Sequence, residues 1–536
     1  MMFPSGTEFC IGQKCGIHFW GVHNHDAMWH LEIAATAFKS FPFQVPTFSG
    51  AALSGYNVLM DLVLYIISFV GIPPIITLFK IVPVFWFVLY TLVAIVFARS
   101  VKNDPRFVAL VLFLLYFADS FGYLLYLYHE SSLHKGGQSF SLQSITALLN
   151  TQFALTLPLL MMQLIFLKKK LFSPKHKLLM GILVFLSFGL KFYGGVVSSV
   201  IAGWYIIEEF IEKKQFSHLT KSAVIIGISG ILSILIFYNP FAAQTTGSVF
   251  TLSPFATVHS VIEAPDMVYK PDMVNARYYL YERGWSPRLV YIEFFSTMLY
   301  FILNFGTRSF GIVYILGKGI FRKLSRFELY ILFTVIIAFL LSIMLVQKGD
   351  WWNTVQFGYY AIFLSNIFLA VLLYDLLVSK RKILMVVGAI IILLTIPGLL
   401  RTLNSFASLD TSYISRKELD AMTFLKKEPD GVVFSSFIAH DGYSFLDYTY
   451  SGYVTAFTGK QTYLAHLGPL NIIGIDAKER NNRIMSNDCT VFNEVEYIYK
   501  VKAHKSEPLN ICKKLVEQKY STIYSNSEVI IYGKNR

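Results

Sequence analysis

Apolar runs of about 20 residues, separated by short loops that carry Lys and Arg, recur through the middle of this 536-residue chain. Such runs are long enough to cross the hydrocarbon core of a bilayer as helices. Only 15% of the residues are charged, whereas a soluble domain has about 25%. The pattern predicts an all-α polytopic membrane protein with about 10 membrane helices. The apolar runs lie at roughly 74–98, 107–128, 143–167, 178–190, 192–210, 222–238, 291–316, 328–346, 357–378 and 383–400.

The basic residues divide unevenly between alternate loops. Five loops, such as 168–177 and 318–326, are rich in Lys and Arg, and the loops between them hold few. Because Lys and Arg are retained on the cytoplasmic side, the rich loops are predicted to be cytoplasmic. The net charge of +13 therefore reflects membrane topology. No basic groove with interleaved aromatic residues indicates nucleic-acid binding.

Residues 178–210 have basic flanks at both ends, so they are predicted to turn back as a hairpin of two short helices near Lys191. A helix of about 13 residues rises only about 20 Å, less than the ~30 Å hydrocarbon core. Lys191 would then lie inside the membrane, where a charge needs a cavity or a partner. The partner is either a lipid phosphate or an intramembrane acid such as Asp119.

Charge topology also divides the chain into three parts. Residues 1–73 are predicted to form an outer loop with an interfacial helix at 56–70, and 74–400 the transmembrane domain. A first transmembrane helix should precede this loop, and its absence means either that the sequence starts late, which we expect, or that this interpretation of its start is wrong. Residues 401–536 are polar, with short strand-like and helix-like runs that predict an extracytoplasmic α/β domain. Cys489 and Cys512 are either paired there or two free thiols.

The segment 21–30 places one acid and three histidines, Asp26, His23, His25 and His30, within ten positions. On a helix, Asp26 and His30 would share a face. A carboxylate in this position can act as a general base. Histidine and aspartate also bind divalent metals, although the spacing matches no recognised metal motif. The third alternative is a helix cap at an interface, in which Asp26 accepts backbone N–H groups.

Two further segments carry candidate binding residues. In 345–360, Lys348, Asn353 and Gln356 are candidates for binding a phosphate or sugar hydroxyls, although the Trp and Tyr residues beside them are also typical interfacial anchors. Lys191 and Tyr193, at the predicted hairpin turn, are candidates for binding a lipid phosphate. No phosphate-binding loop or dinucleotide fingerprint occurs in a credible setting, so a nucleotide-driven pump is not expected. No cofactor is expected, with a divalent metal as the one open possibility.

Several segments resemble the GT-C superfamily of membrane glycosyltransferases, in particular bacterial relatives of protein O-mannosyltransferases and aminoarabinose transferases. The first is the Asp-containing outer loop His25-Asp26-Ala27-Met28-Trp29-His30. It is followed by Phe41-Pro42-Phe43-Gln44-Val45-Pro46, by Tyr56-Asn57, and by the lysine-bearing helix pair around Leu190-Lys191-Phe192-Tyr193-Gly194. A polar extracytoplasmic domain ends the chain. The adjacent acidic pair of the mannosyltransferases is absent, because Ala27 follows Asp26, so mannose specificity is not carried over.

This resemblance implies a glycosyltransferase of the bacterial plasma membrane that moves a sugar from a polyprenyl-phosphate donor to an extracytoplasmic acceptor. Asp26 would be the catalytic base, and Lys191 a contact to the lipid phosphate. Tyr193, Lys348, Asn353, Gln356 and His30 are the remaining substrate-binding candidates. The reaction would be a direct, inverting displacement. The alternative is a transporter or flippase of lipid-linked glycans, which would need charges along an ion pathway; Asp119, Lys191 and Arg308 are the few available.

Overall fold

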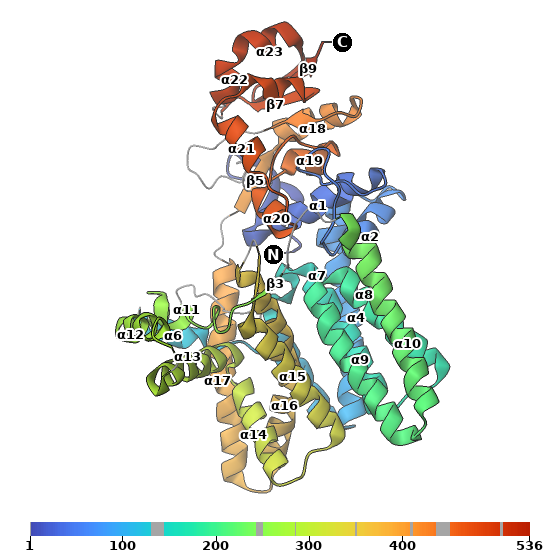
Figure 1. Ribbon diagram of the computed structural model, residues 1–536, viewed down its shortest axis with the longest axis vertical. Coiled ribbons are helices and arrows are strands. Elements are labelled where there is room, and N and C mark those ends of the chain that lie inside the picture. Colours follow the sequence, from blue (N-terminus) through green and yellow to red (C-terminus); the bar gives the residue numbers. More distant parts are fainter. Residues whose placement is uncertain are drawn as a thin grey trace. The chain divides into compact units, whose positions relative to one another are not determined.

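The computed structural model describes residues 2–129, 144–242, 250–284, 286–348, 351–407, 411–435, 451–503 and 507–535 (Figure 1). It is mostly helical and divides into two compact units. The terminal unit comprises Met1–Phe85, Ile234–Gly247 and Leu409–Arg536, and the helical unit comprises Trp86–Ser233 and Ser248–Ser408. The predicted segment 1–73 and residues 409–536 of the predicted segment 401–536 therefore share one unit. The proposed boundaries at 73 and 400 stay a prediction.

The terminal unit contains two small sheets. In the first, the order is β1-β2-β5 and both pairings are antiparallel, so strands from the two ends of the chain lie side by side. In the second, the order is β6-β7-β9-β8, with β6 and β7 parallel and the other pairs antiparallel. The strands are β1 (Thr7–Ile11), β2 (Lys14–Trp20), β5 (Thr411–Ser415), β6 (Val433–Phe434), β7 (Tyr497–Val501), β8 (Tyr520–Ser525) and β9 (Val529–Lys534).

Helices of the terminal unit pack around these sheets. They include α1 (Asp26–Thr36), α2 (Leu59–Ser68), α3 (Pro74–Ile76), α18 (Arg416–Lys427), α19 (Tyr453–Thr458), α20 (Leu467–Ile472), α21 (Lys478–Met485), α22 (Glu507–Ile511) and α23 (Lys513–Lys519). The α/β character predicted after residue 400 is confirmed. Helix α2 has 10 residues, too few to cross a bilayer, and its predicted place at the membrane interface stays a prediction. Disulfides join Cys10 to Cys15 and Cys489 to Cys512, so the paired alternative holds for the latter two.

Among the described residues, eight helices are long and apolar enough to cross a membrane, or nine if the bent pair α5 and α6 is one span. The helices and the two short strands of the rest of the chain are α4 (Val82–Val101), α5 (Pro105–Phe117), α6 (Gly122–His129), α7 (Thr151–Lys168), α8 (Pro174–Leu190), α9 (Phe192–Lys213), α10 (Phe216–Ser233), β3 (Phe250–Leu252), α11 (Ser260–Glu263), α12 (Pro271–Tyr281), α13 (Pro287–Phe305), α14 (Arg308–Ile320), α15 (Arg326–Met344), β4 (Leu345–Gln347), α16 (Gln356–Leu377) and α17 (Lys382–Ala407).

Among the described residues, the eight or nine helices fall short of the expected ten spans for two reasons. The apolar run at 107–128 is bent by 52° between α5 and α6, so it counts as a span only if the two helices are taken together, and the run at 178–190 lies in α8, which has 17 residues. The run at 291–316 is also broken after Phe305, but α13 alone is long enough to cross. The hairpin of two short helices also needs correction. The chain does turn at Lys191, but α9 has 22 residues and rises about 33 Å, enough to span a bilayer.

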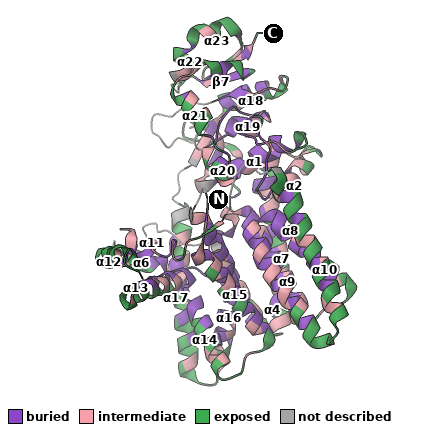
Figure 2. Cartoon of the chain, viewed as in Figure 1, coloured by how far each residue is buried: buried purple, intermediate pink, exposed green. Residues whose placement is uncertain are grey.

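The helices of the helical unit differ in how much of their surface is covered (Figure 2). Most of α16 is buried, whereas α10 and α17 expose apolar side chains such as Ile228, Ile231, Val386 and Leu393. A large exposed apolar surface in water would favour aggregation. In a bilayer the same side chains face lipid. The exposed faces and the eight long helices suit a multi-pass membrane protein.

A buried arginine holds the bend between α5 and α6, which meet at 52°. Arg308 is fully buried at the start of α14. It donates to the carbonyl oxygens of Ala118 (2.8 Å) and Asp119 (3.2 Å), and to Oδ1 of Asn366 (2.8 Å). These carbonyls follow the end of α5, where no further helical turn satisfies them. The Asp119 carboxylate in turn accepts from Thr402 (2.5 Å). Both charged residues therefore serve the packing of this bend.

Candidate active site

The Asp26 carboxylate lies at the first residue of α1, at the end of a 3-10 turn that follows β2. The rest of the helix is largely buried, but the side chain of Asp26 is 56% exposed. His25 Nδ1 lies 2.9 Å from Asp26 Oδ1. A carboxylate at a helix N-terminus is favoured by the helix dipole. This arrangement holds Asp26 accessible, oriented and next to a proton-bearing ring, which suits a general base.

The environment of His25 favours its protonated form. Burial alone lowers the pKa of His25, but the hydrogen bond to Asp26 and the negative charges of Asp26 and Glu32 outweigh that effect. The pKa of His25 therefore lies above its usual value. A protonated His25 would in turn stabilise the ionised form of Asp26.

One turn further along α1, His30 is paired with a second carboxylate. His30 Nδ1 lies 3.0 Å from Oδ1 of Asp61, a fully buried residue of α2. Burial raises the pKa of Asp61, although the hydrogen bond and charge of His30 oppose this. Asp61 Oδ2 is also buried and has no hydrogen-bond partner among the described residues. The sequence identified His30 but not Asp61 as a site residue. An acid within the apolar ten-residue helix α2 was the signal that could have identified Asp61.

His23 has a different environment from the other two histidines of this segment. It is 2% exposed, and its Nδ1 lies 2.8 Å from Ser5 Oγ. Burial lowers the pKa of His23 to about 4, so its ring is neutral at physiological pH. The three histidines thus bind three different partners, and no cluster of three His, Cys, Asp or Glu side chains suited to a metal occurs in the described part of the chain.

A second carboxylate of α1, Glu32, is fully buried and was not singled out from the sequence. Its Oε1 accepts from the backbone N–H of Gly452 at 2.9 Å and lies 3.0 Å from Nδ1 of His466. Both partners belong to the C-terminal segment of the terminal unit. An acid within the apolar stretch 31–38 was the signal that could have identified it. The pairing itself required the tertiary structure.

In the helical unit, three of the predicted binding residues meet around Gln347, the last residue of β4. Tyr193 donates its hydroxyl to Gln347 Oε1 at 2.5 Å, and Asn353 Nδ2 donates to the same oxygen at 2.8 Å. Gln356 donates to Asn353 Oδ1, while its own Oε1 is buried without a hydrogen-bond partner among the described residues. We call Tyr193, Gln347, Asn353 and Gln356 the Gln347 cluster.

Local structure explains how these distant segments meet. Strand β4 pairs with β3, Phe250 of β3 stacks on Phe192 at 5.5 Å, and a 3-10 turn at Trp351–Val355 leads into α16. Gly194 permits the close approach of α9, because a Cβ there would lie 2.6 Å from the hydroxyl oxygen of Tyr360. Lys191 is buried at the break before α9, and Lys348 is exposed next to Gln347.

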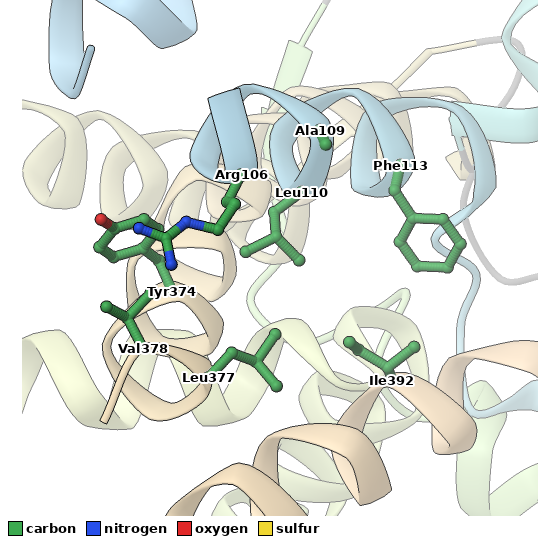
Figure 3. Close-up of a pocket in the computed structure, with 8 residues that line it drawn as sticks. All are labelled: Arg106, Ala109, Leu110, Phe113, Tyr374, Leu377, Val378 and Ile392. Atoms are coloured by element: carbon green, nitrogen blue, oxygen red, sulfur yellow. The ribbon is translucent and has the colours of Figure 1, made fainter. Parts of the chain in front are cut away.

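The predicted site residues therefore fall into two groups. Asp26 and His30 belong to the terminal unit, and Lys191, Tyr193, Lys348, Asn353 and Gln356 belong to the helical unit. Asp26 and His30 share helix α1, and hydrogen bonds join Tyr193, Asn353 and Gln356 through Gln347. A pocket of about 440 Å³ in the helical unit contains none of them (Figure 3). It is lined mainly by apolar side chains of α5, α16 and α17, with Arg106 and Tyr374 among them.

Comparison with known proteins gives a structural match only. No protein-family profile matches the chain, and no curated protein matches it in sequence. The fold matches the oligosaccharyltransferase of Archaeoglobus fulgidus, solved with a tethered acceptor peptide containing the NVT sequon, with a TM-score of 0.55 at 13% identity. The match covers 100% of this chain and 72% of that one. A structure of the same enzyme with Zn and sulfate matches with a TM-score of 0.49 at 15% identity, covering 97% and 70% of the two chains. The chain thus has a GT-C-like fold.

Proposed function

We propose that this protein is a membrane glycosyltransferase that moves a sugar from a polyprenyl-phosphate donor to an extracytoplasmic acceptor. The observation that carries the proposal is the exposed Asp26 carboxylate, held by His25 at the first turn of a buried helix in a GT-C-like fold. The neighbouring fold belongs to an oligosaccharyltransferase, whose name supports glycosyl transfer as the class of reaction. Its tethered acceptor peptide makes a protein acceptor one candidate, beside a lipid or a cell-wall glycan.

In the proposed reaction, Asp26 accepts the proton of an acceptor hydroxyl or amine as that group attacks the anomeric carbon of the donor. The bond from this carbon to the lipid phosphate breaks on the opposite side, so the configuration is inverted and the lipid phosphate leaves with the electron pair. A phosphate is a good leaving group, so the step needs no nucleotide. A divalent metal is not required by this scheme and stays an open possibility.

The Gln347 cluster and Lys191 are proposed to bind the donor. The cluster offers amide and hydroxyl groups of the kind that bind sugar hydroxyls, and Gln356 Oε1 is a buried acceptor without a partner among the described residues. Lys191 supplies a compact positive charge for a phosphate. Lys348 is exposed beside the cluster and is a second candidate for this role. His30 is proposed to contact substrate from its position one turn beyond Asp26.

The transporter alternative receives less support from the helical unit. Asp119 and Arg308 bind backbone and side-chain groups at the bend between α5 and α6, which gives both charges a packing role. A carrier would need such charges to change partners during transport. We therefore retain the transferase as the proposed function, in the plasma membrane with the segment after residue 400 outside the cell.

The test is Asp26→Asn, which keeps the size of the side chain and removes its basicity. A deletion strain is complemented with wild type, Asp26→Asn or the control Asp420→Asn, which makes the same change at an exposed carboxylate of α18. Cell-surface glycans and polyprenyl-phosphate sugars are then measured by mass spectrometry. We expect wild type and Asp420→Asn to restore the lost glycan, and Asp26→Asn to fall short by about 100-fold or more, the usual loss for a general base. Full restoration by Asp26→Asn at equal protein level would refute the proposal.

A further inference from the structure

Glu32 and His466 form a fully buried pair in the terminal unit. Nδ1 of His466 lies 3.0 Å and 3.1 Å from the two carboxylate oxygens of Glu32, and both side chains have no exposed surface. Nε2 of His466 is also buried and has no hydrogen-bond partner among the described residues. The carboxylate therefore fixes the orientation of the imidazole and leaves its second nitrogen uncommitted.

If the pair served packing alone, its burial would be energetically unfavourable. A buried carboxylate loses its hydration, and well-packed apolar side chains of similar volume would often be as stable or more so. His466 adds a backbone strain, since it adopts a left-handed conformation (φ 52°) just before α20. An unsatisfied polar nitrogen adds a further penalty. Three unfavourable features at one point indicate a role beyond stability.

The ring of His466 packs against His25 and Trp29, at the start of α1. Its centroid is 4.6 Å from that of His25, with the two rings nearly perpendicular, and 5.8 Å from that of Trp29. The chain stays close beyond His466, because a Cβ at Gly468 would lie 3.6 Å from His25 Nε2. In the described part of the chain, the charged and titratable groups around His25 are Asp26, Glu32 and His466. His25 itself holds Asp26.

We propose that Glu32 and His466 are positioning residues through which the C-terminal segment fixes the ring and the protonation of His25, and through His25 the Asp26 carboxylate. This inference rests on the proposed role of Asp26 as base. Neither residue needs to touch the substrate. Glu32 supplies a buried negative charge that favours protonated His25, and His466 supplies the surface against which the His25 ring packs.

The first experiment measures His25 directly and needs no substrate. Purified full-length protein is treated with diethyl pyrocarbonate between pH 5 and 8.5, and modification of His25 is followed by peptide mass spectrometry, with His176 of the helical unit as internal control. In Glu32→Gln, which keeps an acceptor for Gly452, we expect the midpoint for His25 to fall by about one pH unit because one nearby negative charge is removed. In His466→Asn, the new amide can still donate to Glu32, and asparagine tolerates the left-handed backbone. We expect His25 of this variant to react about threefold faster or more, because the His466 ring that packs against it is lost.

Unchanged His25 reactivity in both variants, with His176 also unchanged, would overturn the proposal. Asp420→Asn serves as the control for a lost carboxylate in the same unit. Should His466→Asn fail to fold, the isosteric Glu32→Gln still decides the matter, because its expected midpoint shift does not depend on the other variant.

The second experiment separates a positioning role from a structural one. His466→Asn is expected to lower glycan formation in the complemented strain about 10- to 100-fold, the size of effect that a small misplacement of a catalytic group produces. Introduced into a His25→Ala background, the same change should have less than a twofold further effect, because the residue through which it acts is gone. If His466→Asn lowers glycan formation equally in the wild-type and His25→Ala backgrounds, the positioning role is refuted but the proposed function is not. Full activity of Asp26→Asn refutes the proposed function instead, so the two failures are distinguishable.

Discussion

The buried guanidinium of Arg308 gives the sharpest test of how the helical unit is held together. Arg308→Met removes the charge and keeps a long apolar side chain, so it separates hydrogen bonding from packing. The substitution leaves four acceptors without this donor, namely the carbonyl oxygens of Ala118, Asp119 and Phe305 and Oδ1 of Asn366. The bond to Phe305 is long, at 3.4 Å, and the other three are 3.2 Å or shorter.

The magnitude follows from these three bonds. A hydrogen bond to a charged group contributes about 1.5–3 kcal/mol. The gross loss is therefore about 5–9 kcal/mol, from which the relieved cost of burying the guanidinium, several kcal/mol, is subtracted. We expect a net destabilisation of about 3 kcal/mol, concentrated at the bend between α5 and α6. Since each 1.4 kcal/mol is a factor of ten, amides there should exchange about 100-fold faster.

Hydrogen–deuterium exchange with mass spectrometry on the purified protein measures this effect. Peptides covering 114–125 should exchange about 100-fold faster in Arg308→Met, while peptides of β8 and β9 in the terminal unit stay unchanged. Arg288→Met, at the exposed start of α13, is the matched control and should match wild type. Exchange at 114–125 within threefold of wild type, in a folded Arg308→Met protein, would show that the bend does not depend on Arg308 and that the charge is kept for another reason.

Two further predictions concern a buried acid of the terminal unit and the Gln347 cluster. Burial raises the pKa of Glu418 from 4.5 to about 7, against the hydrogen bond it accepts from Tyr453. Because the folded state binds this proton more tightly, the stabilisation is complete below about pH 4.5 and is lost as the pH rises through 7. The thermal unfolding midpoints at pH 5 and pH 8 should therefore differ less in Glu418→Gln than in wild type. An equal difference in both proteins would contradict a raised pKa of Glu418. Gln347→Leu removes the oxygen that Tyr193 and Asn353 share, and should lower glycan formation in the complemented strain about tenfold, with Val346→Ala in the same strand as control; activity equal to that of the control would exclude the cluster from donor binding.

The local elements were largely predictable. Long apolar runs between basic loops predict membrane-length helices because no other structure satisfies the backbone in lipid. The polar segment after residue 400 contains both strands and helices, for instance β7 and α18, as its short runs predicted, because alternating and helical periodicities are local properties. The count of spans was overestimated where a run is bent by a contact that is distant in sequence. The run 107–128 was expected to be one span, and the bend between α5 and α6 is explained only by the hydrogen bonds of Arg308 to the carbonyl oxygens of Ala118 and Asp119.

The candidate site shows the same division. The sequence by itself identified Asp26 and His30 as reactive groups on one helix, and Tyr193, Asn353 and Gln356 as polar groups at the ends of apolar runs, because residue type and helical spacing are local information. Their partners lie far away in the chain. Asp61 is 31 positions from His30, Gln347 is 154 from Tyr193, and His466 is 434 from Glu32. No periodicity links such residues, so only the tertiary structure decided which buried acid meets which imidazole. The tertiary structure thereby placed His466 of the C-terminal segment beside His25 and Asp26. There the free-energy cost of burying Glu32 is offset by its pairing with His466, which no local sequence pattern records.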